Sequence, residues 1–207
     1  MVRISRPPPP SPPDPVFYTM PGGTNLFRLY DPTRTGTTAA SFRYFGPLLR
    51  FDHQRAAPGI PVVDSDRGIY YAALTLSSCV VEVFGDVGLI ECDEWHIAMP
   101  SVTRDVPMLD LRGSGAMRAG SVAALGKTPD HSLSQAWSRH FYGRPEYRAP
   151  EGLLWSNAHN DEESVALYER AEDAITCPTG RMLRLDDPLL RPVLAQIAEA
   201  NNLILVP

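Results

Sequence analysis

The sequence contains almost no lysine and very little cysteine. Of its 19 basic residues 18 are arginine, and Lys127 is the single lysine. The three cysteines, Cys79, Cys92 and Cys177, are widely spaced, odd in number and form no Cys-x-x-Cys motif. No disulfide framework is expected, and this cysteine usage is typical of a protein of the reducing cytoplasm. The arginines supply planar guanidinium groups, which are suited to binding phosphates.

Long hydrophobic runs and an excess of positive charge are also missing. No apolar run approaches the roughly 20 residues that a membrane-spanning helix needs, so a transmembrane protein is excluded. The 19 basic residues face 24 acidic ones, for a formal net charge of −5. Proteins that bind nucleic acids through phosphate contacts are normally basic, so we expect no direct nucleic-acid binding by this chain. With 207 residues, 43% of them hydrophobic, the chain can form one domain with a proper core.

Common metal-binding and catalytic motifs are absent from the sequence. The five histidines include no pair at i, i+4, and no cysteine stands beside one, so no metal site is expected. There is no Gly-x-Ser-x-Gly for a hydrolase nucleophile and no Gly-x-Gly-x-x-Gly for a Rossmann loop. The short glycine pairs do not stand at the spacing of a Gly-x-x-x-x-Gly-Lys-Ser/Thr motif, so no P-loop is predicted.

Proline is dense near the start of the chain, at positions 7–10, 12, 13 and 15. Proline lacks a backbone donor and fixes its own backbone angle, which prevents helix and ladder formation. We therefore predict a disordered Pro-rich tail over residues 1–22 and one folded domain over residues 23–207.

The remaining residues read as an irregular alternation of short strands and helices. Strands are predicted at residues 25–30, 68–73, 89–92, 95–99, 107–111, 152–157, 164–169 and 203–206. Helices are predicted at 75–84, from a capping box at Ser132 to Phe141, and from an Asp187-Pro188 start to about 200. The lack of a regular βαβ order predicts a single α+β domain.

The helix at 75–84 carries one candidate site residue. Its apolar stripe comprises Leu76, Cys79, Val80, Val83 and Phe84. Glu82 lies off this stripe, so it is not expected to be buried beneath its own helix.

Five residues on or beside these elements are candidates for chemistry: Arg28, Arg50, Tyr71, Glu82 and Ser156. Each also has an ordinary structural explanation, such as a surface arginine, a core tyrosine, an exposed helix carboxylate or a small residue at a tight crossing. The pattern alone does not decide whether Tyr70 or Tyr71 faces a pocket.

Taken together, four segments of the chain resemble the RES domain. They are Leu26–Leu29, Leu49–Asp52, Gly68–Phe84 and Gly152–Ser156. The third is the most specific, because a strand tyrosine is followed eleven positions later by a helical glutamate, with Cys79 at the family's small-residue position. The sequence departs from the family pattern in the other segments. Leu49 and Asp52 replace Gly and Asn, Trp155 directly precedes Ser156, and Asn157 replaces an arginine.

The resemblance implies an ADP-ribosyltransferase-like core of short mixed and antiparallel strands with flanking helices. It also implies a toxin of a toxin–antitoxin pair, with NAD+ as substrate, no cofactor, and an antitoxin that carries an Xre-like helix-turn-helix. Cleaving the nicotinamide–ribose bond of NAD+ builds positive charge on the ribose, which the carboxylate of Glu82 would stabilise. Arg28 would bind the pyrophosphate, with Arg50 as a second candidate. Tyr71 would stack on the nicotinamide or the ribose edge, and Ser156 would bond the pyrophosphate or position a neighbour.

The resemblance assigns Glu82, Tyr71 and Arg28 to catalysis and Arg28, Arg50, Tyr71 and Ser156 to NAD+ binding. Three functions remain open from the sequence. The protein is an NAD+ glycohydrolase or phosphorylase that depletes NAD+ and arrests growth, an ADP-ribosyltransferase that modifies a specific target, or a non-enzymatic binding module.

Overall fold

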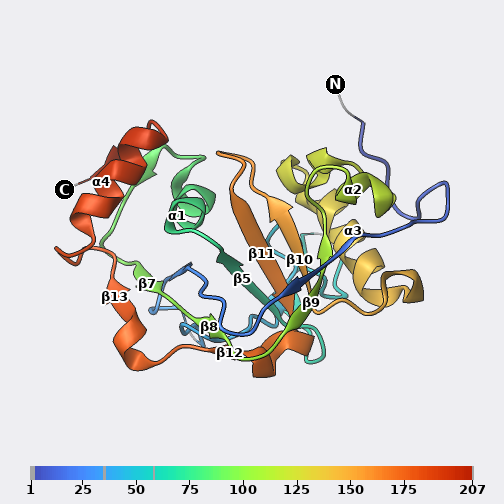
Figure 1. The fold of residues 1–207 in the computed structure, drawn as a ribbon, viewed down its shortest axis with the longest axis horizontal. Coiled ribbons are helices and arrows are strands. Elements are labelled where there is room, and N and C mark those ends of the chain that lie inside the picture. Colours follow the sequence, from blue (N-terminus) through green and yellow to red (C-terminus); the bar gives the residue numbers. More distant parts are fainter. Residues whose placement is uncertain (1–2, 35, 58, 207) are drawn as a thin grey trace.

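A five-stranded mixed sheet runs through the middle of the protein (Figure 1). The computed structural model describes residues 3–34, 36–57 and 59–206. The strands of the central sheet, in spatial order, are β1 (Phe17–Met20), β9 (Val106–Asp110), β10 (Gly152–Ser156), β11 (Glu163–Tyr168) and β5 (Ile69–Ala73). Only the β9–β10 pair of this sheet is parallel.

Smaller sheets and the helices surround the central sheet. A three-stranded sheet has the order β13 (Met182–Arg184), β7 (His96–Ala98), β2 (Arg28–Tyr30). Two-stranded pairs are β12 (Ile175–Thr176) with β8 (Ser101–Val102), β14 (Ile204–Leu205) with β6 (Leu89–Ile90), and β3 (Phe45–Gly46) with β4 (Val62–Val63). The α-helices are α1 (Leu76–Phe84), α2 (Gly115–Arg118), α3 (His131–Gly143) and α4 (Arg191–Ala200). The predicted α+β class and the mixed strands with flanking helices are confirmed.

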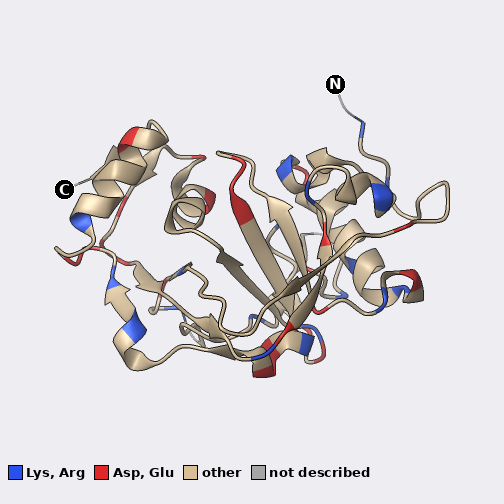
Figure 2. Cartoon of the chain, in the orientation of Figure 1, with Lys and Arg blue, Asp and Glu red and all other residues tan. Residues whose placement is uncertain are grey.

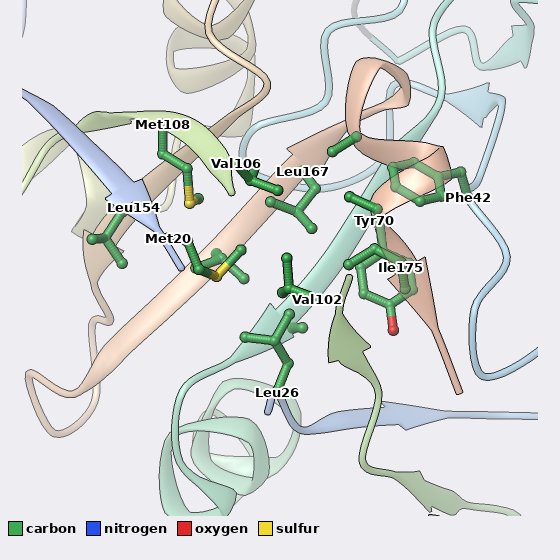
Figure 3. Packing of buried hydrophobic residues seen from close by; sticks show 14 residues of the cluster. Met20, Leu26, Phe42, Tyr70, Val102, Val106, Met108, Leu154, Leu167 and Ile175 are labelled. Atoms are coloured by element: carbon green, nitrogen blue, oxygen red, sulfur yellow. The ribbon is translucent and has the colours of Figure 1, made fainter. Parts of the chain in front are cut away.

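The two faces of the central sheet bury different hydrophobic clusters, because successive side chains of a strand point to opposite sides. Tyr70, Leu154 and Leu167 belong to a cluster with Met20 and Met108, which Figure 3 shows at close range. The opposite face carries a second cluster, which α3 covers with two aromatic side chains. Its largest members are Phe51, Trp137, Phe141, Tyr147, Trp155 and Tyr168.

A third hydrophobic cluster fixes α1 in place. It joins the apolar stripe of α1 to α4, with Cys79, Val80 and Phe84 packed together with Leu194 and Ile197. Charged residues of both signs are interspersed over the helices and loops, while the strands of the central sheet are mostly uncharged (Figure 2).

The predicted disordered tail is wrong in its last part. Phe17–Met20 form β1, an edge strand that pairs with β9 from Phe17 opposite Leu109 to Met20 opposite Val106. No proline lies between Pro15 and Pro21, so the backbone donors of Phe17–Met20 are free to join the sheet. Residues before β1 also contact the folded domain. Ile4 packs on the α3 side of the sheet, and the indole N–H of Trp137 donates to the carbonyl of Ser5 at 2.8 Å.

Two predicted helix starts are shifted in the structure. Asp130 caps α3 by accepting from the backbone N–H of Leu133, so the Ser132 capping box is not formed. Gln135, the expected partner in that box, donates instead to the carbonyl of Leu49. The last helix begins at Arg191 rather than at Pro188. None of the helices in the described part of the chain has the length and apolar character needed to cross a bilayer.

Candidate functional site

Adjacent tyrosines of β5 face opposite sides of the sheet, which settles which one belongs to the candidate site. Tyr70 is fully buried in the cluster of Figure 3, and its hydroxyl donates to the carbonyl of Ala39. Tyr71 is only half-buried and lies beside Trp155 on the other face, with ring centroids 6.4 Å apart. Tyr71 is therefore the residue that can face a ligand.

Helix α1 brings Glu82 to the same side as Tyr71. Thr75 caps the helix by accepting from the backbone N–H of Ser78 at 3.0 Å, which fixes where the first turn begins. The apolar stripe then turns toward α4 and the sheet. Glu82, seven positions beyond the cap and off that stripe, is left half-buried rather than exposed.

Tyr71, Glu82 and Trp155 line one cavity of about 80 Å³. Its wall is otherwise formed by small and apolar residues. The full lining is Leu29, Tyr71, Ala72, Ala73, Cys79, Glu82, Val83, Trp155 and Ser164. The cavity thus combines one carboxylate with two aromatic side chains in an otherwise apolar surrounding.

The carboxylate of Glu82 is poorly compensated by the protein. Its Oε1 atom is buried and has no hydrogen-bond partner among the described residues. Burial raises the pKa of Glu82, while the nearby charges of Arg50 and His159 and the indole N–H of Trp155 lower it in part. A buried acceptor without a partner is unusual in a folded protein and points to a ligand contact or a functional role.

The hydroxyl of Tyr71 is fully engaged by a buried network. It donates to Oδ1 of Asp52 at 2.9 Å and accepts from the backbone N–H of Phe51 at 2.9 Å. Asp52 is completely buried, and Arg43 donates to both of its carboxylate oxygens. Burial, followed by the Asp52 charge, raises the pKa of Tyr71 well above its usual value. Tyr71 therefore offers a ligand its ring and keeps its proton.

Arg50 lies on the loop that Asp52 organises. The backbone N–H groups of Leu48 and Leu49 both donate to the Asp52 carboxylate, which closes the loop around it. Arg50 itself is half-buried, donates to the carbonyl of Thr128, and lies close enough to Glu82 to lower the pKa of that carboxyl. The structure thus brings Tyr71 and Glu82 together in one cavity, whereas Arg50 lies near Glu82 but is not part of the lining.

Arg28 lies behind this cavity rather than in its lining. Its guanidinium carbon is 4.1 Å from the centroid of the Tyr70 ring, on the opposite face of the sheet from Tyr71. Its Nε atom is buried without a hydrogen-bond partner in the described part of the chain, and burial lowers its pKa. Cys79 lies in the cavity lining and accepts from the backbone N–H of Leu29, the neighbour of Arg28, at 3.2 Å; burial raises the pKa of its thiol to about 12.

Ser156 is also outside the cavity lining. It ends β10 opposite Glu163 of β11. Because it directly follows Trp155 in the strand, its side chain points to the other face, the one that carries Tyr70 and Leu154. Of the five candidates, Tyr71 and Glu82 line the cavity, Arg50 lies near Glu82 outside the lining, and Arg28 and Ser156 lie on the far side of the sheet.

The sequence prediction missed three residues that shape the site: Asp52, Arg43 and Trp155. Asp52 was visible as a departure from the family's asparagine, and a buried carboxylate at that position needs a cation such as Arg43. Trp155 was visible as an aromatic residue one place closer to the serine than usual. Across residues 3–34, 36–57 and 59–206, no three His, Cys, Asp or Glu side chains gather into a group that could hold a metal ion.

A protein-family model for the RES domain matches residues 25–187. The chain belongs to the RES domain family. The resemblance inferred from the four segments is confirmed. The fold is also similar to that of a chain in the crystal structure of the M. tuberculosis MbcT–MbcA toxin–antitoxin complex. The identity is 16%, the match covers 86% of this chain and 92% of that one, and the TM-score is 0.58. A search of curated proteins gives no match.

Within this RES domain, the matched range contains every candidate site residue from Arg28 to Ser156. It begins after β1 and ends before α4. Strand β1 and helix α4 thus lie outside the matched range, and α4 packs against α1.

Proposed function

We propose that this RES protein is an NAD+-consuming toxin of a toxin–antitoxin pair, and that it cleaves the nicotinamide–ribose bond of NAD+. The observation that carries the proposal is the Glu82 carboxylate, which has an unpartnered, buried oxygen in a cavity walled by Tyr71 and Trp155. Family membership and the similarity to a chain of a toxin–antitoxin complex support the same function.

Cleavage of the nicotinamide–ribose bond requires an anion near the ribose, and it requires no covalent nucleophile of the protein. As the bond between C1′ and the pyridinium nitrogen breaks, the electron pair leaves with neutral nicotinamide, and positive charge develops on the ribose. A preorganised carboxylate in a site of low polarity stabilises that charge more strongly than water does. The oxygen of water or phosphate then bonds to C1′ and releases a proton to the solvent. Glu82 supplies the carboxylate in this proposal.

The surrounding residues would orient the dinucleotide. Tyr71 presents its ring, because its hydroxyl is already engaged by Asp52 and the Phe51 backbone. Arg50, on the Glu82 side, is well placed to bind the pyrophosphate dianion with its planar fork. Arg28 and Ser156 would complete the pyrophosphate contacts if the ligand extends past Cys79 to the far side of β5.

The proposal includes an antitoxin as the partner and the cytoplasm as the location. The antitoxin would be a cytoplasmic protein with an Xre-like helix-turn-helix, which neutralises this chain by covering or filling the cavity near Glu82. With a net charge of −5, this chain would leave operator binding to that partner.

Nicotinamide release by the purified protein tests the proposed reaction. Wild type should release nicotinamide from NAD+ without any added macromolecule, and Glu82→Gln should not. Glu199→Gln provides a matched control, because Glu199 is an exposed glutamate on the helix α4. Release that depends on an added protein, with ADP-ribose attached to it, would assign the chain to the transferases instead. A wild type that neither cleaves nor transfers would refute an enzymatic role.

Expression in cells tests the toxin assignment separately. Unrestrained production of the wild-type chain should arrest growth and lower cellular NAD+, and the Glu82→Gln chain should be tolerated. Arrest by both chains would show that toxicity does not come from NAD+ cleavage.

A further inference from the structure

The carboxylate of Asp52 accepts hydrogen bonds from three separate segments of the chain. Nη2 of Arg43 donates to both of its oxygens, at 2.8 and 2.9 Å. The hydroxyl of Tyr71 donates to Oδ1 at 2.9 Å, and the backbone N–H groups of Leu48 and Leu49 donate to Oδ2. Both oxygens thus have donors as partners, which suits a carboxylate because a carboxylate only accepts.

An asparagine, the family's usual residue at this position, would fit these donors poorly. Its amide has one accepting oxygen and one donating NH2 group. If the NH2 group faces the loop, the N–H groups of Leu48 and Leu49 lose their acceptor. If it faces the strand, the hydroxyl of Tyr71 loses its acceptor. Because two contacts outweigh one, the oxygen should stay with the loop, and Asp52→Asn should act mainly on Tyr71.

Arg43 connects this carboxylate to β5. Its backbone exchanges two hydrogen bonds with Ile69 at the edge of that strand, at 2.8 and 3.1 Å. Tyr71 stands two positions after Ile69, so both side chains lie on the same face of the sheet. The edge of β5 therefore positions both side chains that donate to Asp52, the Arg43 guanidinium and the Tyr71 hydroxyl.

The loop that ends at Asp52 carries Arg50. Between them, the backbone N–H of Phe51 donates to the Tyr71 hydroxyl at 2.9 Å, and its carbonyl accepts from Oγ of Ser138 in α3 at 2.6 Å. The Tyr71 hydroxyl thus lies between two residues of the loop and joins it to the strand. A change at Asp52 reaches two groups that the proposed function assigns to NAD+, the ring of Tyr71 and the guanidinium of Arg50.

We propose that Asp52 is a positioning residue for NAD+ binding, which holds the Tyr71 ring and the Arg50 loop in the arrangement that receives the dinucleotide. This inference rests on the proposed function. Asp52 is completely buried, so it acts through these neighbours. The Tyr71 hydroxyl then belongs to the architecture of the site rather than to the reaction, because the protein already uses its proton and accepts from the Phe51 backbone.

Steady-state kinetics of nicotinamide release test this role. Asp52→Asn should raise KM for NAD+ by about 10-fold, the size of one hydrogen bond to a charged group, and change kcat by less than about 3-fold. Tyr71→Phe keeps the ring, removes the hydroxyl and should raise KM similarly. The double variant should raise KM little beyond either single variant, because both changes remove the same link.

Asp64→Asn is the matched control. Asp64 is buried and paired with Arg55, as Asp52 is with Arg43, and its other hydrogen bond is to the backbone of Asp66. This variant should lower the melting temperature and leave KM unchanged. The kinetics of all variants are compared below the lowest melting temperature.

Several outcomes would overturn the positioning role. Equal rises of KM in Asp64→Asn and Asp52→Asn would assign the effect to a general loss of stability. An unchanged KM in Asp52→Asn and Tyr71→Phe, additive effects in the double variant, or a loss of kcat at unchanged KM would also contradict it. If Asp52→Asn does not fold, Tyr71→Phe decides, because it breaks the same link and keeps the Arg43 ion pair. A wild-type chain that cleaves no NAD+ would instead refute the proposed function, and this inference with it.

Discussion

Replacing Glu82 by glutamine should lower the rate of NAD+ cleavage and, at the same time, slightly raise the stability of the fold. Glutamine keeps the length and shape of the side chain, so the apolar stripe of α1 and its contacts with α4 are unchanged. The change removes a negative charge from a site where one carboxylate oxygen is buried and has no partner in the described residues. Burial of that charge disfavours the folded state, and its removal should relieve the penalty.

The expected gain in stability is modest. An unsatisfied buried polar group costs about 1–3 kcal/mol, and the low end applies because Glu82 is half-buried and glutamine still has an amide to satisfy. A gain of about 1 kcal/mol raises the melting temperature of a chain of this size by roughly 2–4 °C. In contrast, loss of one preorganised electrostatic partner of a transition state lowers the rate by about 100- to 1000-fold. Glu82→Gln should therefore melt slightly higher than wild type and release almost no nicotinamide.

The pH dependence of both quantities gives a further check. The pKa of Glu82 is raised in the folded state, so protonation of Glu82 favours folding. The wild-type chain should thus lose stability relative to Glu82→Gln as the pH rises through that pKa, and the two should converge at lower pH. Activity needs the carboxylate and should fall as the pH drops through the same pKa. Thermal melts and nicotinamide release at matched pH values measure both effects.

Two results would contradict this reasoning. If melting temperature and activity fall together in Glu82→Gln, the carboxylate supports the fold. If neither changes, the catalytic carboxylate lies elsewhere and the assignment of the Tyr71-to-Glu82 segment is wrong.

Three further predictions follow from other parts of the site. Arg28→Lys should lower kcat/KM for NAD+ strongly, because an ammonium group cannot replace a planar guanidinium that stacks on Tyr70. Arg34→Lys, at an exposed position, is the control. Equal kinetics of Arg28→Lys and wild type would show that only charge matters at position 28. Asp52→Asn should lower the free energy of unfolding by about 2 kcal/mol, because it removes the charged partner of the Arg43 guanidinium and weakens its hydrogen bonds; an unchanged denaturation midpoint would refute this. Nicotinamide release should persist in EDTA, and a loss that zinc restores would overturn the metal-free mechanism.

The sequence predicts elements best where local chemistry and tertiary packing agree. Helix α1 was predicted at 75–84 and begins at Leu76 with Thr75 as its cap, because the apolar stripe and the cap point to the same boundaries. Strand β1 was missed because the preceding prolines dominate the local composition, whereas its pairing with β9 is set by residues about 90 positions away. The α3 cap failed for a related reason, since Gln135 is recruited by the carbonyl of Leu49.

In the candidate site too, local relations could be predicted and contacts between distant segments could not. Tyr71 and Glu82 could be found because one strand and the next helix fix their relation within eleven residues. The position of Arg28 could not, because Arg28 and Leu29 alternate in β2, and only the assembled sheets show which of them faces the cavity. The roles of Asp52 and Trp155 depend on contacts between distant segments. The burial of both side chains and the hydrogen-bond partners of Asp52 become visible only once the fold is known.

The segment that precedes the matched RES range extends the central sheet by one strand and contacts α3. Residues 3–20 contact α3 through Ile4 and Ser5 and then enter the sheet as β1. A chain shortened to begin at residue 22 would expose the backbone donors and acceptors along β9, which is the kind of open sheet edge that recruits other chains. It would also remove the Ser5 carbonyl that accepts from the indole N–H of Trp137. Proline-rich sequence, although poor at forming strands, thus leads directly into a strand that pairs with β9.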